Sequence, residues 1–374
     1  MTQGRLWVIG LAAALAWGTS PGRAQAEAAG TGPDFPRGKI SGYIWADAYY
    51  NVTGDPEHRY NSSGADSANQ SVSGSYSGGK PSLIGRDLNG IQIRRIYFQH
   101  DADLSIKYST RFRLEVDGKS LTSDGKLGVN VKAAYFQAKQ VIPRGTFLVG
   151  VLGTPIWETS EAAWGYRSIE KTIADFRGIG SSADIGVQMK GYADDGHKVG
   201  YNLMVGNGLG QKPENNRYKK VYFGLPVRPN SDVTIEPYAD YEWAAGGKDK
   251  ATYKLFVGYA MRKLSLGAEL VDRVNHNPSG SNAEPLGLSF FGTYKAKENT
   301  TLFARYDRYQ PDTRATDRID SDLYVAGVDW SPARNVSIMP NVLATQYHAR
   351  GAADAPPHHD MQARVTFNVK FSKP

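Results

Sequence analysis

Hydrophobic and polar residues alternate with a period of two along most of the chain. The segment 107–117 is the clearest case. Its apolar face consists of Tyr108, Thr110, Phe112, Leu114 and Val116, and its other face is polar or charged. The segment 361–371 alternates in the same way. Because successive side chains of a β-strand point to opposite faces, this pattern predicts strands with one apolar and one polar face.

Sixteen segments of this kind follow one another. They lie near 39–50, 91–102, 107–117, 127–141, 147–152, 185–192, 198–206, 219–227, 233–242, 251–261, 265–272, 286–295, 300–309, 322–330, 336–346 and 361–371. The second segment loses its phase at Arg94 and Arg95. One extra residue in a strand restores the alternation, so we predict a β-bulge there.

The connections between these segments alternate between long and short, beginning with a long one at 51–90. Short turns at one end and long loops at the other are typical of an outer-membrane barrel with an even number of strands. Spanning β-structure must close on itself, because lipid cannot satisfy free backbone groups. We therefore predict an all-β fold, a 16-stranded antiparallel transmembrane β-barrel with one long inward-folded loop. The alternative is a soluble all-β protein whose charged faces meet bulk solvent.

The N-terminus has the features of a secretory signal peptide. Arg5 precedes an apolar core at 6–17, and Ala24-Gln25-Ala26 fits a cleavage site. We expect a signal peptide at 1–26, a short N-terminal segment at 27–38 and the barrel at 39–374. Such a chain is exported through the periplasm to the bacterial outer membrane. Removing the signal changes the formal net charge from +7 to +5.

Composition limits the chemistry. The chain has no cysteine, which excludes a disulfide scaffold and cysteine metal sites. The segment 74–80 resembles a phosphate-binding loop, but Pro81 stands where Ser or Thr is required. His358, His359 and Asp360 lie in the last long loop without a convincing metal-ligand pattern. We predict no catalytic residues, no metal and no cofactor, and therefore not an enzyme.

The connection 153–184 is long and rich in aromatic and charged residues. An external loop in water has little use for Trp157, Trp164 and Tyr166, whereas a loop folded into the barrel packs them on the wall. Since a barrel of sixteen strands encloses a wide channel, such a loop is the candidate constriction. Its basic residues are Arg167, Lys171 and Arg177. The alternative is a loop that packs over the barrel mouth or against a neighbouring subunit.

The alternation also places basic residues on the inner wall. The candidates are Lys107, Arg111, Arg113, Lys132, Lys190, Lys220, Lys254, Arg305, Arg364 and Lys370. Seven acidic candidates face them, so the predicted positive excess is modest. Rings of Arg and Lys favour anions in a pore. We predict a constriction and solute-binding site formed by Lys107, Arg111, Arg113, Lys132 and Lys190 with Trp157, Trp164, Tyr166, Arg167, Lys171 and Arg177.

Several stretches resemble the phosphate-selective porin O and P family. They are 94–98, 108–115, 134–136, 153–158, 168–170, 177–180, 185–188, 200–202 and 205–208. The likeness lies mainly within residues 91–210. It implies a 16-stranded barrel, often a homotrimer, that passes anions through a basic constriction. The segment 152–156 lacks the Gln and Lys of the corresponding family segment.

The expected function is a porin: passive diffusion of small hydrophilic solutes, with a weak preference for anions that include phosphate-like ones. Outer-membrane lipid and the barrel-assembly machinery are the expected partners, the latter because Phe371 and the apolar positions before it resemble an insertion signal, here followed by Ser372-Lys373-Pro374. Nucleic acid is not expected. A β-rich glycan-binding protein, secreted or in the outer membrane, and a barrel-type outer-membrane hydrolase are the alternatives.

Overall fold

The computed structural model describes residues 34–54, 76–77, 80–81, 85–117, 120–276, 283–352 and 358–373. The predicted signal peptide at 1–26 lies outside these residues. The barrel strands are β1 (Arg37–Thr53), β4 (Asn89–Asp103), β5 (Tyr108–Asp117), β6 (Asn130–Lys139), β7 (Gly145–Gly153), β8 (Ala183–Tyr192), β9 (Gly200–Gly206), β10 (Lys220–Gly224), β11 (Val233–Glu242), β12 (Asp249–Ala260), β13 (Leu264–His276), β14 (Leu286–Lys297), β15 (Thr300–Gln310), β16 (Arg318–Ala333), β17 (Val336–Arg350) and β18 (Asp360–Lys373).

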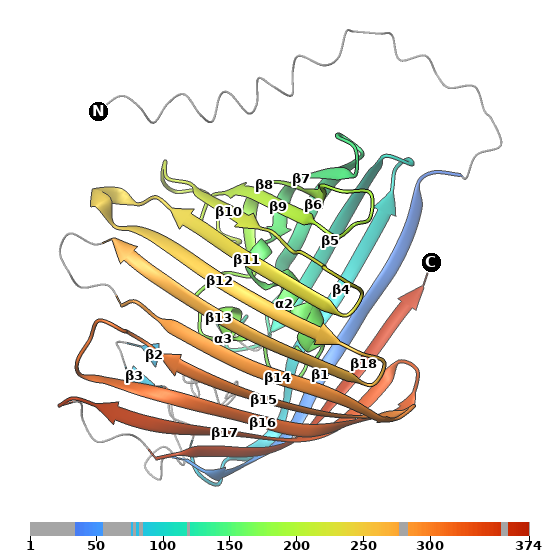
Figure 1. Ribbon diagram of the computed structural model, residues 1–374. Helices are drawn as coiled ribbons and strands as arrows, with labels where there is room; N and C mark the ends of the chain where they lie inside the picture. Colours follow the sequence, from blue (N-terminus) through green and yellow to red (C-terminus); the bar gives the residue numbers. More distant parts are fainter. Residues whose placement is uncertain are drawn as a thin grey trace, which may run out of the picture. The chain divides into compact units, whose positions relative to one another are not determined.

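These sixteen strands form one closed antiparallel barrel, in which each strand pairs with its neighbours in the chain and β1 pairs with β18 (Figure 1). The predicted fold class is confirmed. The remaining elements are the short pair β2 (Tyr76–Ser77) and β3 (Lys80–Pro81), the helices α2 (Pro155–Trp164) and α3 (Ile173–Phe176), and the 3₁₀ turn η1 (Ala245–Gly247). No helix in the described ranges is long and apolar enough to cross a membrane.

The predicted bulge on β4 is present. Trp45 of β1 pairs with Arg95, and the next residue, Ala46, pairs with Ile93, so Arg94 is the extra residue. A second bulge occurs on β6, where Arg113 pairs with Ala133 and Leu114 with Val131. Lys132 is therefore the extra residue of β6. Bulges of this kind turn additional side chains toward one face of a strand.

The outer face of the barrel carries exposed apolar side chains on strand after strand. They include Ile44, Phe112, Val149, Leu203, Phe223, Leu255, Phe290, Leu302, Val342 and Phe367. Exposed aromatic residues gather at the short-turn ends of the strands, at Tyr108, Tyr259, Tyr294, Trp330 and Phe371. An apolar band bounded by aromatic side chains is the surface that a bilayer requires of a barrel.

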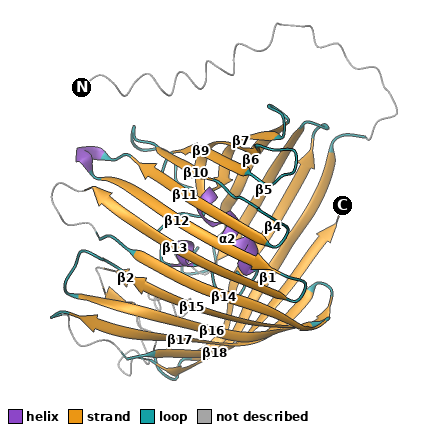
Figure 2. Ribbon diagram, viewed as in Figure 1, coloured by secondary structure: helices purple, strands orange, loops and turns teal. Residues whose placement is uncertain are grey.

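The connection between β7 and β8, residues 154–182, lies inside the barrel. We call it the inward loop. Its helix α2 contacts strands β9 to β14, and α3 contacts β13 and β14. In Figure 2 both helices lie behind these strands. The predicted inward-folded loop is therefore observed, and the alternative of a loop over the barrel mouth is wrong.

Candidate functional site

The two ends of the inward loop are tied together where it leaves the wall. The backbone N–H of Thr154 donates to the Ser182 carbonyl oxygen at 3.3 Å, and the Thr154 hydroxyl donates to the Ser181 carbonyl. The indole N–H of Trp157 also donates to the Ser182 carbonyl, at 2.8 Å. Pro155 begins α2, a position that suits its fixed backbone angle. These contacts fix the direction in which α2 enters the barrel.

Aromatic packing holds the far end of α2 against the wall. Trp164 is fully buried, and its ring centre lies 5.3 Å from that of Phe291 on β14. Tyr166 stacks on Phe303 of β15 at 4.5 Å between ring centres. The apolar cluster continues on the wall through Phe256, Leu323, Val325, Met339 and Leu343. Inward-facing apolar residues on β12 to β17 thus form the seat of the loop.

Inner-wall cations also hold the loop, by donating to its backbone carbonyl groups. The donors and acceptors are Arg94 to Ser168 and Ile169, Lys254 to Ile156, Arg273 to Gly178 and Ile179, Arg305 to Lys171, and Arg364 to Ile169. They come from β4, β12, β13, β15 and β18, so the loop is held from several sides. Lys254, Arg305 and Arg364 face inward as predicted, but their side chains support the loop.

A cavity of about 190 Å³ lies between the inward loop and the wall formed by β1 and β4 to β8. We call it the basic cavity. Its basic lining residues are Arg111, Arg113, Lys132, Arg167 and Lys190; its aromatic ones are Tyr43, Tyr97, Tyr135 and Trp157; and its acidic ones are Glu158 and Glu161. Five cationic groups therefore face two carboxylates. The lining carries the positive excess that the sequence predicted for this part of the wall.

Among the cationic residues of this cavity, Arg113 is the one whose charge is least neutralised by neighbouring carboxylates. Its Nε donates to Oε1 of Gln99 at 2.6 Å, and its guanidinium lies 4.9 Å from the ring centre of Tyr97. Within the described part of the chain it makes no ion pair. Arg111, by contrast, contacts Asp101 at 2.6 Å. The positive charge of Arg113 is thus not neutralised by a carboxylate of the described residues.

Glu115 is shared between two cations. Its Oε1 accepts from Arg95 at 2.6 Å, and its Oε2 lies 3.3 Å from Nζ of Lys132. The bulge on β6 brings Lys132 to this position. Lys132 also contacts the hydroxyl of Ser182 at the end of the inward loop, at 3.3 Å. The pair connects the wall to the loop beside the basic cavity.

Arg167 connects the loop to itself through two carboxylates. It contacts Glu161 on α2, and its Nη2 lies 3.0 Å from Oδ2 of Asp175 on α3. Burial raises the pKa of Glu161, an effect that Arg167 only partly offsets. Burial also opposes ionisation of Asp175, but Lys171 and Arg167 outweigh it and hold the pKa of Asp175 well below its ordinary value. Asp175 is therefore the permanent anion of this group.

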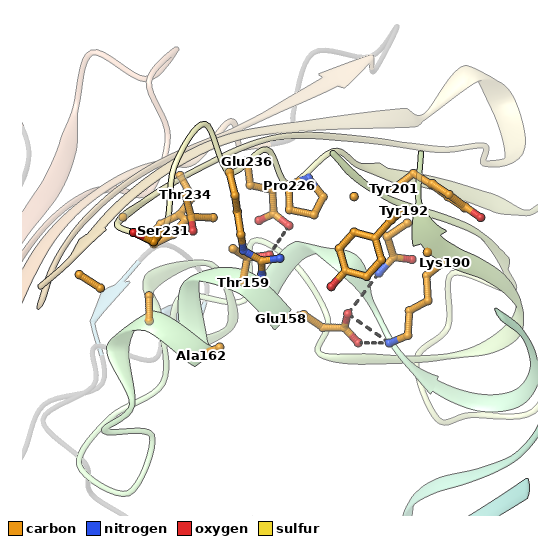
Figure 3. Close-up of a pocket in the computed structure, with 18 of the residues that line it drawn as sticks. Glu158, Thr159, Ala162, Lys190, Tyr192, Tyr201, Pro226, Ser231, Thr234 and Glu236 are labelled. Atoms are coloured by element: carbon orange, nitrogen blue, oxygen red, sulfur yellow. Dashed lines mark hydrogen bonds and ion pairs between the residues drawn. The ribbon is translucent and has the colours of Figure 1, made fainter. Parts of the chain in front are cut away.

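A second, larger cavity of about 690 Å³ lies on the other side of Glu158 and Lys190. We call it the turn-side cavity, because its lining includes Arg144, Arg228 and Asp232 from the short turns. Lys190 and Glu158 line both cavities and contact each other at 3.1 Å. Figure 3 shows this pair beside α2. The side-chain N–H of Asn202 donates to the same carboxylate at 3.2 Å. The pair marks the junction between the two cavities.

The predicted site residues separate into three groups. Arg111, Arg113, Lys132, Lys190, Arg167 and Trp157 line the basic cavity. Trp164 and Tyr166 seat the loop on the wall, while Lys171 contacts Asp175 and Arg177 lies over the rings of Phe176 and Tyr309. Lys107 does not line the basic cavity. It belongs to the exposed turn before β5, because the strand begins only at Tyr108.

The three tyrosines of the lining, Tyr43, Tyr97 and Tyr135, were not among the predicted site residues. Tyr43 stands next to Tyr97 across the β1–β4 pairing, with ring centres 4.5 Å apart. Each of these two tyrosines has a polar or charged residue two positions away on the same strand face, although one such neighbour of Tyr43 is Trp45. The alternation therefore indicates that both tyrosines point inward. The sequence of the loop contains Glu158 and Glu161, but it does not show which side of α2 their carboxylates occupy.

No family model matches the sequence, and no curated protein sequence matches it. Solved structures do match. The chain is similar to the outer membrane channel DcaP of Acinetobacter baumannii, with a TM-score of 0.62 and 12% identity over 90% of this chain and 97% of that one. It is similar to an anion-selective porin from Comamonas acidovorans, with a TM-score of 0.58 and 12% identity over 90% and 100%. For OmpT of Vibrio cholerae the values are 0.55 and 12% over 91% and 99%. The chain therefore has a porin-like barrel fold.

Proposed function

We propose that this chain is a porin of the bacterial outer membrane. It forms a water-filled path for the passive diffusion of small hydrophilic solutes and prefers anions weakly. The observation that carries the proposal is the basic cavity between the inward loop and the wall of β1 and β4 to β8. Five cationic side chains and two carboxylates line it.

The outer face supports the membrane location. Apolar side chains remain exposed on strands around the barrel, and aromatic ones gather at the short-turn ends. A soluble glycan-binding protein would expose this band to water, which costs about 25 cal/mol for each Å² of apolar surface. A bilayer removes that cost. The band therefore favours the barrel over the soluble alternative.

The electrostatics of the basic cavity support a weak preference rather than a strict one. Arg113 offers a positive charge without an ion pair in the described residues, whereas Arg111, Lys132, Lys190 and Arg167 each contact a carboxylate. Rings of cationic groups bias a pore toward anions, and paired charges contribute less to that bias. Phosphate-like anions fit the guanidinium groups, because Arg binds phosphate oxygens through two hydrogen bonds.

The proposal includes export and assembly. A signal peptide at 1–26 would direct the chain through the periplasm, and the apolar positions up to Phe371 would be read by the barrel-assembly machinery. A homotrimer is the assembly that the resemblance to phosphate-selective porins implies. Outer-membrane lipid would surround the apolar band. The chain would carry out no catalytic step.

Planar-bilayer recording of the purified chain tests the channel itself. We expect stepwise increases of conductance in KCl as single molecules insert. Heat-modifiable mobility in detergent gels would accompany them, since a closed barrel resists unfolding by detergent alone. A mature chain that stays soluble without detergent and gives no conductance steps would contradict the proposal and favour glycan binding.

A further inference from the structure

A group of charged side chains lies on the outer face of the barrel at the long-loop ends of β15, β16 and β17. We call it the outer basic cluster; its members are Arg308, Arg318, Asp320, Asp322, His348 and Arg350. On β16, Leu323 and Val325 are buried in the apolar cluster that packs against the inward loop, whereas Tyr324 between them is exposed on the outer face. Asp320 and Asp322 share the side of Tyr324. The cluster therefore faces away from the interior of the barrel.

The carboxylates of this cluster lie underneath its guanidinium groups. Asp320 is fully buried and contacts Arg308 at 3.0 Å, Arg318 at 2.9 Å and Arg350 at 3.2 Å. Asp322 contacts Arg308 at 2.8 Å and His348 at 2.9 Å. Three guanidinium groups thus outnumber two carboxylates. The Arg350 side chain is 53% exposed, so the surface presents positive charge.

A groove of about 540 Å³ runs along the outer wall next to this cluster. Its floor contains small outward-facing residues, Gly292, Ala304, Ala326 and Ala344, on four neighbouring strands. Gly292 pairs with Ala304, and Ala304 pairs with Ala326, so they form a row across the sheet. Its lining is mostly apolar and carries no exposed carboxylate. The groove lies in the part of the outer face that meets lipid tails under the proposed function.

Tyr306 joins the groove to the cluster. Its ring lines the groove and lies 5.3 Å from the ring of Tyr324, and its hydroxyl donates to Asp322 at 3.1 Å. Along β16 the order from the long-loop end is charged residues, Tyr324, then Ala326. From Asp320 to Ala326 a strand extends about 20 Å. A membrane lipid has the matching order, with an anionic headgroup that faces the charged residues and then an acyl chain that faces the apolar groove.

We propose that this outer surface binds a phosphorylated lipid of the outer leaflet, with a phosphate on the outer basic cluster and an acyl chain in the groove. Guanidinium groups recognise phosphate oxygens through paired hydrogen bonds. The small residues let the acyl chain approach the sheet closely. A second copy of the same face is a poorer occupant, because it would bring two positive clusters together. This inference rests on the proposed membrane location of the barrel.

Native mass spectrometry of the full chain in detergent tests the inference, with lipid A as the probe. We expect bound lipid A on the unaltered protein, and about tenfold weaker binding when the probe is dephosphorylated. Arg350→Gln removes an exposed guanidinium, and Ala326→Leu fills the groove; each should weaken lipid A binding about tenfold. Arg314→Gln, another half-exposed arginine with an ion pair, and Val149→Leu, on the outer face of β7, are the matched controls.

Channel conductance is recorded on the same variants, which separates the two proposals. Conductance steps with lipid A binding that is equal in all variants, or absent, would overturn the lipid site and leave the porin intact. Binding of inorganic phosphate alone that matches lipid A would also overturn it, because the groove would then have no role. Loss of an oligomer in Ala326→Leu, without change in lipid binding, would assign the groove to a second copy of the chain.

Discussion

The guanidinium of Arg113 lies 4.9 Å from the ring centre of Tyr97, on a neighbouring strand of the inner wall. The ring supports the cation from one side, and Gln99 accepts its Nε hydrogen bond. Neither partner carries a charge. The arrangement holds a positive group at the surface of the basic cavity without neutralising it, which is how a wall residue can act on a passing anion.

Replacing Arg113 therefore has a direct effect on selectivity. A unit charge about 4 Å from an ion in water contributes about 1 kcal/mol. We expect Arg113→Gln to lower the permeability ratio of chloride to potassium about fivefold, and Arg111→Glu with Arg113→Glu to reverse it. Reversal potentials in a KCl gradient measure this. Lys107→Gln is the control, because Lys107 lies in an exposed turn outside both cavities. An equal shift in that variant would remove Arg113 from its assigned role.

Trp164 tests the seat of the inward loop. Its side chain is fully buried against Phe291 and Phe303. Trp164→Ala should lower the free energy of unfolding by about 3–5 kcal/mol, as aromatic truncations in cores do. A loosened loop should also raise single-channel conductance and its noise. Trp243→Ala, on an exposed tryptophan, provides the comparison. Unchanged conductance in Trp164→Ala would show that the loop does not narrow the path.

Glu161 gives the cavity a dependence on pH. Because its pKa is raised, it takes up a proton at a higher pH than an ordinary glutamate as the solution is acidified. Protonation removes one negative charge beside Arg167, so the anion preference should increase as the pH is lowered, beginning at a higher pH than an ordinary glutamate would give. Glu161→Gln should show the stronger preference already at neutral pH. A preference of the unaltered channel that stays constant with pH would contradict this assignment.

Asp175 should contribute to stability in the opposite range of pH. Its folded-state pKa lies below the ordinary value, so its contribution is present above that value and is lost as the pH falls toward the folded-state pKa. We expect Asp175→Asn to lower the free energy of unfolding by about 1–3 kcal/mol near neutral pH, because Arg167 and Lys171 lose a partner. The difference should shrink below about pH 4. Urea unfolding in detergent at several pH values measures it, with the exposed Asp124→Asn as the control.

The barrel could be predicted from the sequence, because the alternation of apolar and polar residues within each strand identifies the two faces of that strand. Even the irregular strand at Arg94 was read correctly, since a bulge is the simple way to keep Ile93 and Ile96 in phase with the rest. The sequence pattern does not show that Lys107 lies in a turn, because a charge at the start of an alternating run looks the same in a strand and in a turn. The turn at 104–107 ends the face that the pattern extended.

The site was predicted only in part, because its lining comes from packing between distant segments. The basic residues of β5, β6 and β8 followed from the alternation. The contact of Trp164 with Phe291 joins positions far apart in the chain, and no local pattern contains it. The same holds for Arg305 and Arg364, whose inward direction was correct. That they hold carbonyl groups of the loop depends on where the loop lies.

Reversal potential of the unaltered chain in a planar bilayer, under a KCl gradient, tests the central claim most directly. We expect conductance steps with a reversal potential on the chloride side, reduced in Arg113→Gln and unchanged in Lys107→Gln. A reversal potential on the potassium side, or one that Arg113→Gln leaves unchanged, would contradict the assignment of the basic cavity as the place where solutes are selected.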